Sequence, residues 1–585
     1  MSHPTYRWSN EQLRKQAGVL DGAESPRLVL REANFLNSYL HRWDRANIWI
    51  YGDRIVYVGE RMPERAGEAD IVDCRDTYVV PGYIEPHAHP FMEYNPLAFA
   101  RYAAQRGTTA FVCDNLLFFL GLSPAHAFAL LDDFRRTPYT LYWWCRFDAQ
   151  TELTPRPAER FNTRDILEWL GHEAVLQGGE LTSWPRLLEG DDDILSWMQE
   201  AKRLNKKIEG HFPGASEKTL AKLMLLGSDC DHEAMTGREA MERLRQGYRV
   251  SLRHSSIRPD LDVLLKELRE LGVRRFDRFF VTTDGSHPYF LENGVTDLLI
   301  RKAMEHGVPD IDAYHLASHN VAVYYNLEHL HGSVATGRVA NLNLLADPRD
   351  PTPVGVLAKG KWIKRDGRAL DDGAAMDWAR YGLTPLELPW TLTEEDVHFS
   401  DPLGIHLVND VITKPYQSGL DLGRDDLPGG HDECFLLALA KDGTWSIQTV
   451  LKGFARDLGG LASSYAGPEE IVLIGKNKRD MRLAFERMKE IGGGTVLAEA
   501  GRIVHEVPLP LLGRMSDLEL NDFIPLEKKM IRLLKERGYP FEDPAFTLFF
   551  LSATHLPFVR LTPSGIYDVK NRKVLVPSRK RRTGR

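Results

Sequence analysis

Short apolar runs recur along the middle of the chain, separated by stretches with helical spacing. We interpret eight of them as strands: YVVPGYIEPHAH, TAFVCDN, LYWWCRFDA, AVLQGGEL, KKIEGHF, GSDCDHE, RVSLRHSS and RFFVTTDG. Between them, segments such as DILSWMQEAKRLN place apolar residues three and four positions apart, as amphipathic helices do. This alternation over about two hundred residues predicts an α/β fold, a (β/α)8 barrel of the TIM type, with a doubly wound open sheet as the alternative.

The segments on either side of this region have a different hydrophobic pattern. Short alternating runs extend from about Ile48 to Val80, and similar runs return from Gly337 to Arg368. They predict small antiparallel strands, and the second flank could close the sheet that the first flank opens. From about Leu386 onward, strands, the charged helical segment NKRDMRLAFERMKEIGG and the run VPLPLLGRMSD are typical of a further α+β domain.

The resulting division has four segments. Residues 1–80 hold the N-terminal segment and the first part of the flanking sheet, residues 81–330 the barrel, residues 331–385 the second part of the flanking sheet, and residues 386–585 the C-terminal α+β domain.

Composition narrows the class of protein. The 585 residues are 43% hydrophobic and carry a formal net charge of only -8, with acids and bases interspersed, which argues against nucleic acid as a partner. The N-terminus has no apolar core of signal-peptide length, and no window offers the ~18 apolar residues of a membrane span. Five scattered cysteines without a CxxC pair indicate reduced, mostly buried thiols. We therefore expect a cytoplasmic protein that acts on a small molecule, with a homo-oligomer left open.

Metal-ligand residue types stand at the ends of five predicted strands. They are His87 and His89 on the first strand, Glu180 on the fourth, His211 on the fifth, His232 on the sixth and Asp284 on the eighth. Residues i and i+2 of a strand share a face, so His87 and His89 can reach one ion. A single strand-end histidine is more often a packing residue, but six such residues at one barrel mouth predict a centre of two divalent ions.

Such a centre favours hydrolysis. Metal coordination lowers the pKa of a bound water from about 15.7 towards about 7. Asp284 could both bind metal and carry the proton of that water, or serve as a ligand alone. Glu233 directly follows His232 and could be a second proton carrier, although strand alternation would turn it towards solvent.

Two loops offer weaker candidates for substrate binding. Ser255, Ser256 and Arg258 in SSIRPD could position a substrate, or simply cap a helix beside a surface arginine. His287 in TDGSHP lies close to Asp284 and could contact substrate or cap the turn.

The motifs PGYIEPHAH, QGGELTSWP, EGHFPG, SDCDHEAMTG, TTDGSHP and VPLPLLGRMSD, in this order, resemble the adenine deaminase family of the amidohydrolase superfamily. The likeness is strongest to the divergent bacterial branch of that family, and it extends to the closing segment FLSATHLPFVRLTPSGIYDV. It implies that the two flanks, in residues 1–80 and 331–385, form a small β-sandwich beside the barrel. It also implies hydrolysis of adenine to hypoxanthine and ammonia at a binuclear centre of manganese or iron, with zinc as an alternative. It also implies that Glu180 bridges the ions, that His87, His89, His211, His232 and Asp284 complete the ligands, and that Asp284 is the catalytic acid/base.

Three departures concern the substrate. Typical members read HxHIESS where this chain reads HAHPFMEYN, so a carboxylate is absent or displaced to Glu93. CDNLLFF replaces the usual Asp-Pro-His-Glu and keeps only Asp114, which we expect at the substrate, and Gly285 replaces a second aspartate. Another amino-heterocycle or a cyclic amide is therefore an alternative substrate. A third hypothesis is that the protein is a non-catalytic scaffold with the same fold.

Overall fold

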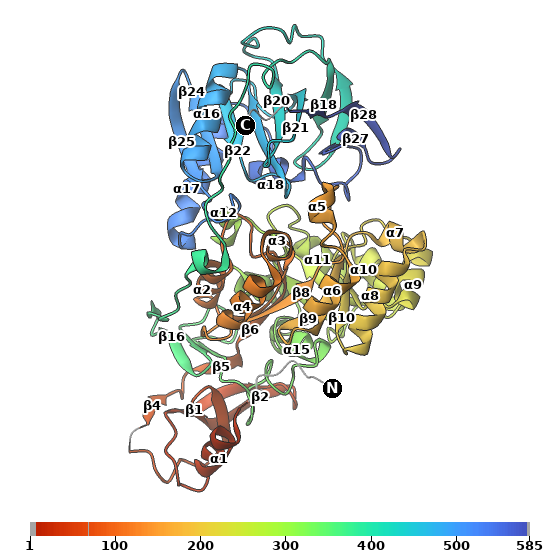
Figure 1. The fold of residues 1–585 in the computed structure, drawn as a ribbon. Coiled ribbons are helices and arrows are strands. Elements are labelled where there is room, and N and C mark those ends of the chain that lie inside the picture. Colours follow the sequence, from red (N-terminus) through yellow and green to blue (C-terminus); the bar gives the residue numbers. More distant parts are fainter. Residues whose placement is uncertain (1–7, 68, 582–585) are drawn as a thin grey trace.

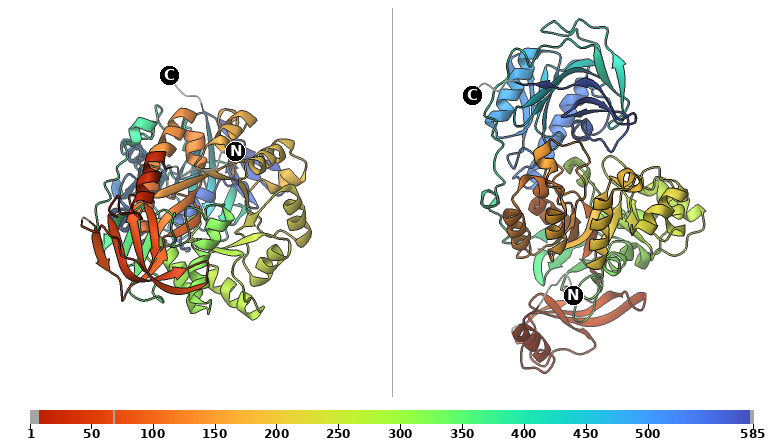
Figure 2. Two further views of the ribbon diagram at one scale, coloured as in Figure 1. Left: turned by 90° about the horizontal axis from the view of Figure 1, so that it is seen from below. Right: turned by 45° about the vertical axis from the view of Figure 1, so that its right-hand side comes forward.

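The computed structural model describes residues 8–67 and 69–581, and its parts follow one another along the molecule (Figure 1). A barrel occupies the middle, a sheet formed by both of its flanks lies at one end, and the C-terminal α+β domain lies at the other. The right-hand view of Figure 2 shows the same succession. The first seven residues of the predicted N-terminal segment and the last four of the C-terminal domain fall outside the described residues.

The barrel confirms the predicted fold. Within the described residues, eight parallel strands pair in chain order: β6 (Tyr83–Ala88), β7 (Thr108–Cys113), β8 (Thr140–Cys145), β9 (Val175–Leu181), β10 (Lys207–Gly210), β11 (Cys230–Asp231), β12 (Arg249–Arg253) and β13 (Phe279–Thr282). A main-chain bridge between Ala88 and Asp284 links the first strand to the last. The open-sheet alternative is therefore wrong.

Amphipathic helices connect these strands. The main ones are α2 (Pro96–Ala104), α4 (Pro124–Phe134), α6 (Thr163–Gly171), α8 (Asp192–Arg203), α9 (Glu217–Leu226), α10 (Gly237–Arg245), α11 (Leu261–Glu270) and α13 (Thr296–Glu305). In α8, the Asp191 side chain accepts from the Ile194 amide and caps the helix, while Trp197 and Met198 are buried. The other α-helices before the C-terminal domain are α1 (Asn10–Gly18), α3 (Leu116–Gly121), α5 (Pro155–Ala158), α7 (Trp184–Leu188), α12 (Pro288–Leu291), α14 (Asp310–Leu316) and α15 (His319–Tyr324).

A second sheet, here called the base sheet, combines both flanks of the barrel. Its order is β17-β16-β15-β14-β5-β1-β2-β3, with β4 beside β1. The strands are β1 (Leu28–Asn37), β2 (Arg42–Tyr51), β3 (Arg54–Gly59), β4 (Asp70–Asp73), β5 (Tyr78–Pro81), β14 (Leu342–Leu345), β15 (Gly355–Ala358), β16 (Lys361–Arg365) and β17 (Arg368–Ala369). Side chains from the two flanks share one hydrophobic cluster, which explains why neither flank folds into a sheet of its own.

Three details of the flanks differ from the prediction. The strands begin at Leu28, well before Ile48, and β4 and β5 run parallel to β1, so the sheet is mixed. The run YVVPGYIEPHAH is two strands, because the chain leaves the base sheet after Pro81 and enters the barrel at Tyr83. The intervening Gly82 allows this crossing, since a Cβ there would lie 2.2 Å from Thr109 Oγ1.

The C-terminal domain is α+β, as predicted. Its main sheet has the order β19-β18-β21-β20-β23-β22-β24-β25, with β29 beside β21. The strands are β18 (Leu403–Leu407), β19 (Thr413–Gln417), β20 (Glu433–Ala440), β21 (Trp445–Lys452), β22 (Gly460–Ser463), β23 (Glu470–Gly475), β24 (Gly494–Glu499), β25 (Arg502–Pro508) and β29 (Arg579–Lys580). A smaller sheet holds β26 (Val559–Thr562), β27 (Gly565–Asp568) and β28 (Lys573–Pro577), and the helices are α16 (Lys478–Glu490), α17 (Leu520–Glu536) and α18 (Pro544–Phe550).

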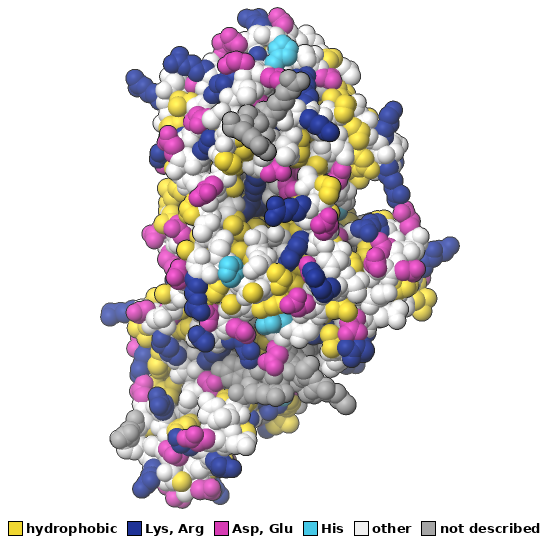
Figure 3. Space-filling model, in the orientation of Figure 1, with side chains coloured by type: hydrophobic (Ala, Val, Ile, Leu, Met, Phe, Trp, Pro, Cys, Tyr) yellow, Lys and Arg dark blue, Asp and Glu magenta, His cyan; other side chains and the backbone are white. Residues whose placement is uncertain are grey.

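The surface and the thiols agree with the composition. On the face in Figure 3, basic and acidic side chains are intermixed rather than gathered by sign. Cys74, Cys113, Cys145, Cys230 and Cys434 are buried and free, as expected. Among the described residues, no helix has both the length and the apolar character needed to cross a membrane.

Candidate metal centre and substrate cavity

Three predicted ligands converge at the ends of β6 and β13. The Nε2 atoms of His87 and His89 lie 3.2 Å apart, and Asp284 Oδ1 lies 3.4 Å from the first and 3.1 Å from the second. His89 Nδ1 donates to Asp114 Oδ2 at 2.9 Å, and His87 Nδ1 faces Glu209 Oε1 at 3.3 Å. In neutral rings held this way, both Nε2 atoms are lone-pair donors beside a carboxylate oxygen, an arrangement that suits a cation.

A second group forms at the ends of β9, β10 and β11. His211 Nδ1 lies 2.6 Å from Glu180 Oε1 and 3.3 Å from His232 Nε2. His232 Nε2 is 3.3 Å from the same Glu180 oxygen, and its Nδ1 donates to Glu209 Oε1 at 3.2 Å. The donor set is again imidazole nitrogen and carboxylate oxygen, the ligands that divalent transition metals accept.

Glu180 lies between the two groups. While Oε1 faces His211 and His232, Oε2 lies 3.8 Å from His89 Nε2. The backbone before it is tightly constrained, because Gly179 has φ +95° and a Cβ there would lie 2.5 Å from the carbonyl oxygen of Glu209. Asp284 also takes a left-handed conformation, with φ +50°, which is unusual for a residue other than glycine and common at functional sites.

Buried charges hold these ligands in place. Arg146 lies 2.6 Å from Asp114 Oδ2 and 2.8 Å from Glu180 Oε2 through its Nη2 atom. On the other side, Arg253 Nη1 donates to Asp284 Oδ2 at 3.1 Å and also to Glu233. Residues that orient metal ligands in this way tune both geometry and affinity.

The pKa shifts of the predicted ligands are consistent with a cation site. Burial by itself raises the pKa of Glu180, yet Arg146 and His211 hold it well below its usual range. Burial lowers the pKa of His89, but the hydrogen bonds to Asp114 and Asp284 raise it to about 9. The carboxylates are therefore ionised and the imidazoles attract positive charge, so the residues present fit divalent ions.

A cavity of about 160 Å³ opens on this cluster and is closed by the C-terminal domain. Its polar lining includes Glu233, Arg258 and Gln150. Its apolar lining includes four phenylalanines and consists of Phe91, Met92, Pro213, Ile257, Val411, Phe546, Phe549, Phe550 and Leu556. Phe91, Gln150 and Phe549 also border a neighbouring cleft of about 500 Å³ between the barrel and the C-terminal domain. The site thus has a charged wall from strand ends and an aromatic wall largely from α18.

The predicted substrate residues divide into two sets. Glu233 and Arg258 line the cavity. Ser255 is buried and receives the Arg258 amide, and Ser256 receives the His287 amide, so both order the loop. Neither serine borders the cavity.

Asp114 and His287 are placed differently from the prediction. Asp114 is completely buried behind His89, where it orients that ring and pairs with Arg146, and it does not border the cavity. His287 is buried against the C-terminal domain, donating to Asp543 Oδ2 at 2.8 Å and lying 3.1 Å from the Tyr465 hydroxyl. Neither residue borders the cavity in this structure, because other side chains fill the space around them.

The structure also locates Glu93 and Gly285, two of the positions at which the sequence departs from the family pattern. Glu93 lies beside α17 and α18 rather than at the metal-ligand cluster, and its main chain pairs with Met515. At Gly285, a Cβ would lie 3.3 Å from the His89 ring and 3.6 Å from Met92 Sδ, so Met92 occupies part of the space that a second aspartate would need.

Several functional residues were missed from the sequence. Glu209, Arg146, Arg253, Gln150 and His555 all contact the ligands or the cavity. Glu209 and Arg253 stand within or at the end of predicted strands, so their buried charge was a usable signal. His555 lies in the C-terminal domain, in which no site residue was predicted from the sequence.

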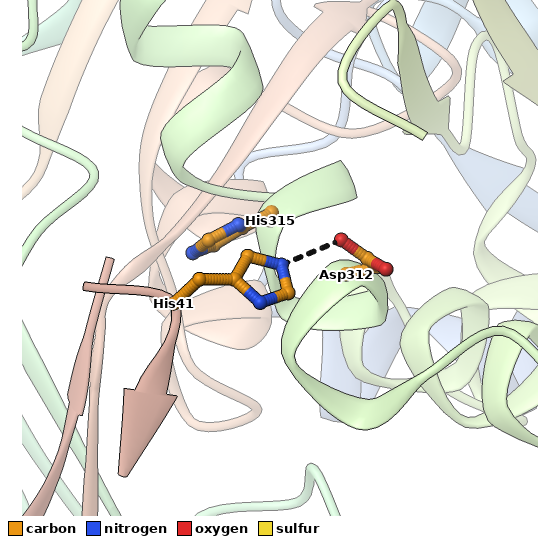
Figure 4. Close-up of side chains that lie close together, drawn as sticks. All are labelled: His41, Asp312 and His315. Carbon is orange, nitrogen blue, oxygen red and sulfur yellow. Dashed lines mark hydrogen bonds and ion pairs between the residues drawn. The ribbon is translucent and has the colours of Figure 1, made fainter. Parts of the chain in front are cut away.

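A further histidine cluster lies away from the cavity, where the β1–β2 turn meets α14 (Figure 4). His41 Nε2 donates to Asp312 Oδ1 at 2.9 Å, and its ring lies edge-on to His315 at 5.4 Å. The contact joins the base sheet to the barrel.

Known families match the two main parts of the chain. Residues 78–363 match the Amidohydrolase family, whose members generally use divalent metals, and residues 411–573 match the Adenine deaminase C-terminal domain. The match to solved structures includes the β-aspartyl dipeptidase of Fervidobacterium islandicum AW-1, with a TM-score of 0.46 and 17% identity over 59% of this chain and 98% of that one.

Curated relatives match nearly the whole chain. A Bacillus cereus protein named "Putative adenine deaminase" is 59% identical over 98% of this chain and 97% of its own length. A Bacillus subtilis strain 168 protein of the same description is 50% identical over 99% of this chain and 100% of its own length. This protein therefore belongs to the adenine deaminase family of the amidohydrolases.

Proposed function

We propose that the protein is a metal-dependent hydrolase that converts adenine and water to hypoxanthine and ammonia. The observation that carries the proposal is the pair of adjoining ligand groups, with Glu180 facing His211 and His232 on one side and His89 on the other, beside a cavity lined by aromatic rings. One divalent ion would be held by His87, His89 and Asp284 and another by His211 and His232, with Glu180 reaching both; manganese or iron is our first choice and zinc the alternative. When bound, the ions supply a water whose pKa is lowered towards about 7.

Asp284 is the proposed proton carrier. Its Oδ1 atom faces both imidazoles of the first group, while Oδ2 accepts from Arg253, so the carboxylate has a fixed orientation. Burial raises its pKa, but the hydrogen bonds from His87 and His89 hold it well below the usual range. The carboxylate is therefore ionised, and this is the state that can accept a proton from the attacking water and then deliver it to the leaving amine.

Glu233 is the second proposed proton residue. Burial raises its pKa, whereas Arg253 and His211 lower it strongly, so it is a carboxylate at neutral pH. It borders the cavity within 3.8 Å of Arg258 Nη1. From there it can accept a hydrogen bond from a substrate N–H and orient the ring before attack.

The aromatic wall supports a planar substrate. Phe546 and Phe550 stack with their centroids 5.1 Å apart, and Phe549 meets Phe550 edge-on at 5.2 Å. Flat rings pack well against such faces, and a cavity of about 160 Å³ favours a small heterocycle over a bulky nucleoside.

Ammonia release from adenine tests the proposal. Protein loaded with Mn(II), Fe(II) or Zn(II) should release ammonia with the absorbance change of hypoxanthine formation, and Glu180→Gln loaded in parallel should not. No turnover by any fully loaded form of the wild-type protein would refute adenine as the substrate.

A second candidate is the same chemistry on another amino-heterocycle or on a cyclic amide. Arg258 favours it, because the arginine borders the cavity and its buried Nη2 atom has no hydrogen-bond partner among the described residues. A substrate with a carbonyl or carboxylate group would satisfy that donor. A substrate screen in which adenine clearly dominates would remove this candidate.

The cytoplasmic location and a homo-oligomer expected from the sequence stay predictions. Cell fractionation tests the first and light scattering of the purified protein tests the second.

A further inference from the structure

His555 brings the C-terminal domain into the substrate cavity. It follows α18 in the segment SATHLP and borders the cavity together with Glu180 and His211. Its ring meets His211 edge-on, with centroids 5.4 Å apart at 86°, and meets Phe550 at 6.1 Å. The only imidazole that this domain adds to the described cavity lining therefore lies next to a predicted metal ligand.

The hydrogen bonding of this ring fixes which nitrogen carries the proton. His555 Nδ1 lies 3.2 Å from the main-chain oxygen of Gln150. A carbonyl oxygen can only accept, so Nδ1 donates, and in the neutral ring Nε2 keeps its lone pair. Among the described residues, none forms a hydrogen bond or ion pair with Nε2, so it is an available acceptor at the edge of the cavity.

Two contacts hold His555 in this orientation. Thr151 Oγ1 donates to the Ser552 carbonyl oxygen at 2.6 Å, which fastens the loop before His555 to the loop after β8. Gln150 uses its carbonyl for His555 and its side-chain Nε2 to donate to Glu180 Oε2 at 3.3 Å. The acceptor is therefore positioned relative to the metal cluster by a short chain of contacts.

A role as a metal ligand fits less well. The groups of His, Asp and Glu whose ligand atoms lie within 4.8 Å of one another include His87, His89, Glu180, His211, His232, Glu233 and Asp284 at this site, and within the described residues His555 belongs to none of them. It lies beside the cluster and faces the space that a substrate would fill.

We propose that His555 is a substrate-binding residue that determines specificity by accepting a hydrogen bond from a ring N–H of the heterocycle. The proposal rests on the proposed deaminase function and deepens it: the preferred substrate is a free base that keeps a ring N–H, not a base substituted there. A site built to accept that hydrogen bond discriminates strongly against an analogue that lacks it, because a buried acceptor is then left unpaired.

The test compares two substrates in four proteins. Adenine has a ring N–H and 9-methyladenine has none, and each is assayed for ammonia release and for calorimetric affinity. The proteins are the wild type, His555→Phe, His555→Gln and His431→Phe. Phenylalanine keeps the bulk of the ring without the acceptor, glutamine keeps an acceptor oxygen near the Nε2 position, and His431 is an exposed control in the same domain.

We expect the wild type and His431→Phe to prefer adenine over 9-methyladenine by about a hundredfold or more in kcat/KM. In His555→Phe this preference should fall below about tenfold, mainly through a higher KM for adenine, and His555→Gln should recover part of it. Metal content and melting temperature of each variant show whether the fold and the centre are intact.

An unchanged preference in a folded, metal-loaded His555→Phe would overturn the inference while leaving the deaminase proposal standing. If the wild type binds adenine but releases no ammonia, the proposed function fails, and the loss of affinity in His555→Phe still decides the role of His555. If the wild type neither binds nor deaminates adenine, both proposals are wrong.

Discussion

Buried histidines serve opposite purposes at the two ends of the barrel. At the mouth, His89 and His232 face carboxylates that raise their pKa despite burial, to about 9 for His89. His331 lies at the opposite end, near the base sheet. The residue after it, Gly332, accepts a hydrogen bond through its carbonyl oxygen from Ser38, which directly follows β1. His331 Nε2 lies 3.0 Å from the Tyr142 hydroxyl, and burial lowers its pKa to about 3.

The difference shows what makes a histidine part of a metal centre. Within the described residues, His331 forms no ion pair with a carboxylate, so its buried ring stays neutral beside the Tyr142 hydroxyl. His89 and His232, by contrast, are surrounded by carboxylate oxygens, whose negative charge must be balanced by positive charge. Burial is common to both ends, and the carboxylates distinguish them.

The largest expected effect comes from removing the shared carboxylate. Glu180→Gln should lower ammonia release from adenine by at least about a thousandfold and reduce bound metal, because the amide carries no charge to hold two cations together. Activity and metal content are measured together. The matched control is Glu217→Gln on the exposed first turn of α9, and equal activity in both variants would contradict the assignment.

Breaking the buried charge network should cost stability. Arg146→Met leaves Asp114 and Glu180 without their common partner and should reduce the free energy of unfolding by about 3–5 kcal/mol. Urea denaturation in the presence of chelator separates this effect from metal loss. Arg301→Met, which removes a partly exposed pair with Asp350, should change the free energy by no more than about 1 kcal/mol.

The opposite end of the barrel gives a pH-dependent prediction. The unfolded chain protonates His331 below about pH 6.5, whereas the folded protein does not until about pH 3, so its contribution to stability is lost as pH falls between these values. From pH 7.5 to pH 5.0, wild type should lose about 2 kcal/mol more unfolding free energy than His331→Gln. Identical pH slopes in the two proteins would show that this ring is not held neutral.

The aromatic wall should have the smallest effect. Phe550→Leu removes a ring that stacks with Phe546 and should raise KM for adenine about tenfold with little change in kcat, since it affects substrate and transition state alike. Steady-state kinetics measures the changes in KM and kcat separately. Phe541→Leu, in the packing of the C-terminal domain and away from the cavity, is the control and should leave KM unchanged.

The barrel and the ligand positions were largely predictable. Apolar runs of strand length alternating with amphipathic helices give the fold, and the carboxyl ends of parallel strands meet at one face. His87, His89, Glu180, His211, His232 and Asp284 were selected by that rule and do lie together. The start of the base sheet was placed too late, because β1 contains the polar and charged positions Arg31, Glu32 and Asn34, which obscure its alternation.

The substrate side was much less predictable. Asp114, His287 and Glu93 are polar residues near the mouth in sequence, and each turned out to bind protein groups instead of facing the cavity. The orientation of a loop side chain depends on which buried partner it finds, and those partners come from other elements.

The sequence alone predicted the barrel and the positions of the metal-ligand residues, because strand alternation and helix periodicity are local patterns that extend over a few residues. Only the tertiary structure decided which side chains line the cavity across from the predicted metal ligands. Gln150 and His555 lie 405 positions apart, and Thr151 and Ser552 lie 401 apart, yet these contacts seat the C-terminal domain on the cavity. No periodicity spans such distances, since the contacts arise from how two separately folded parts pack against each other.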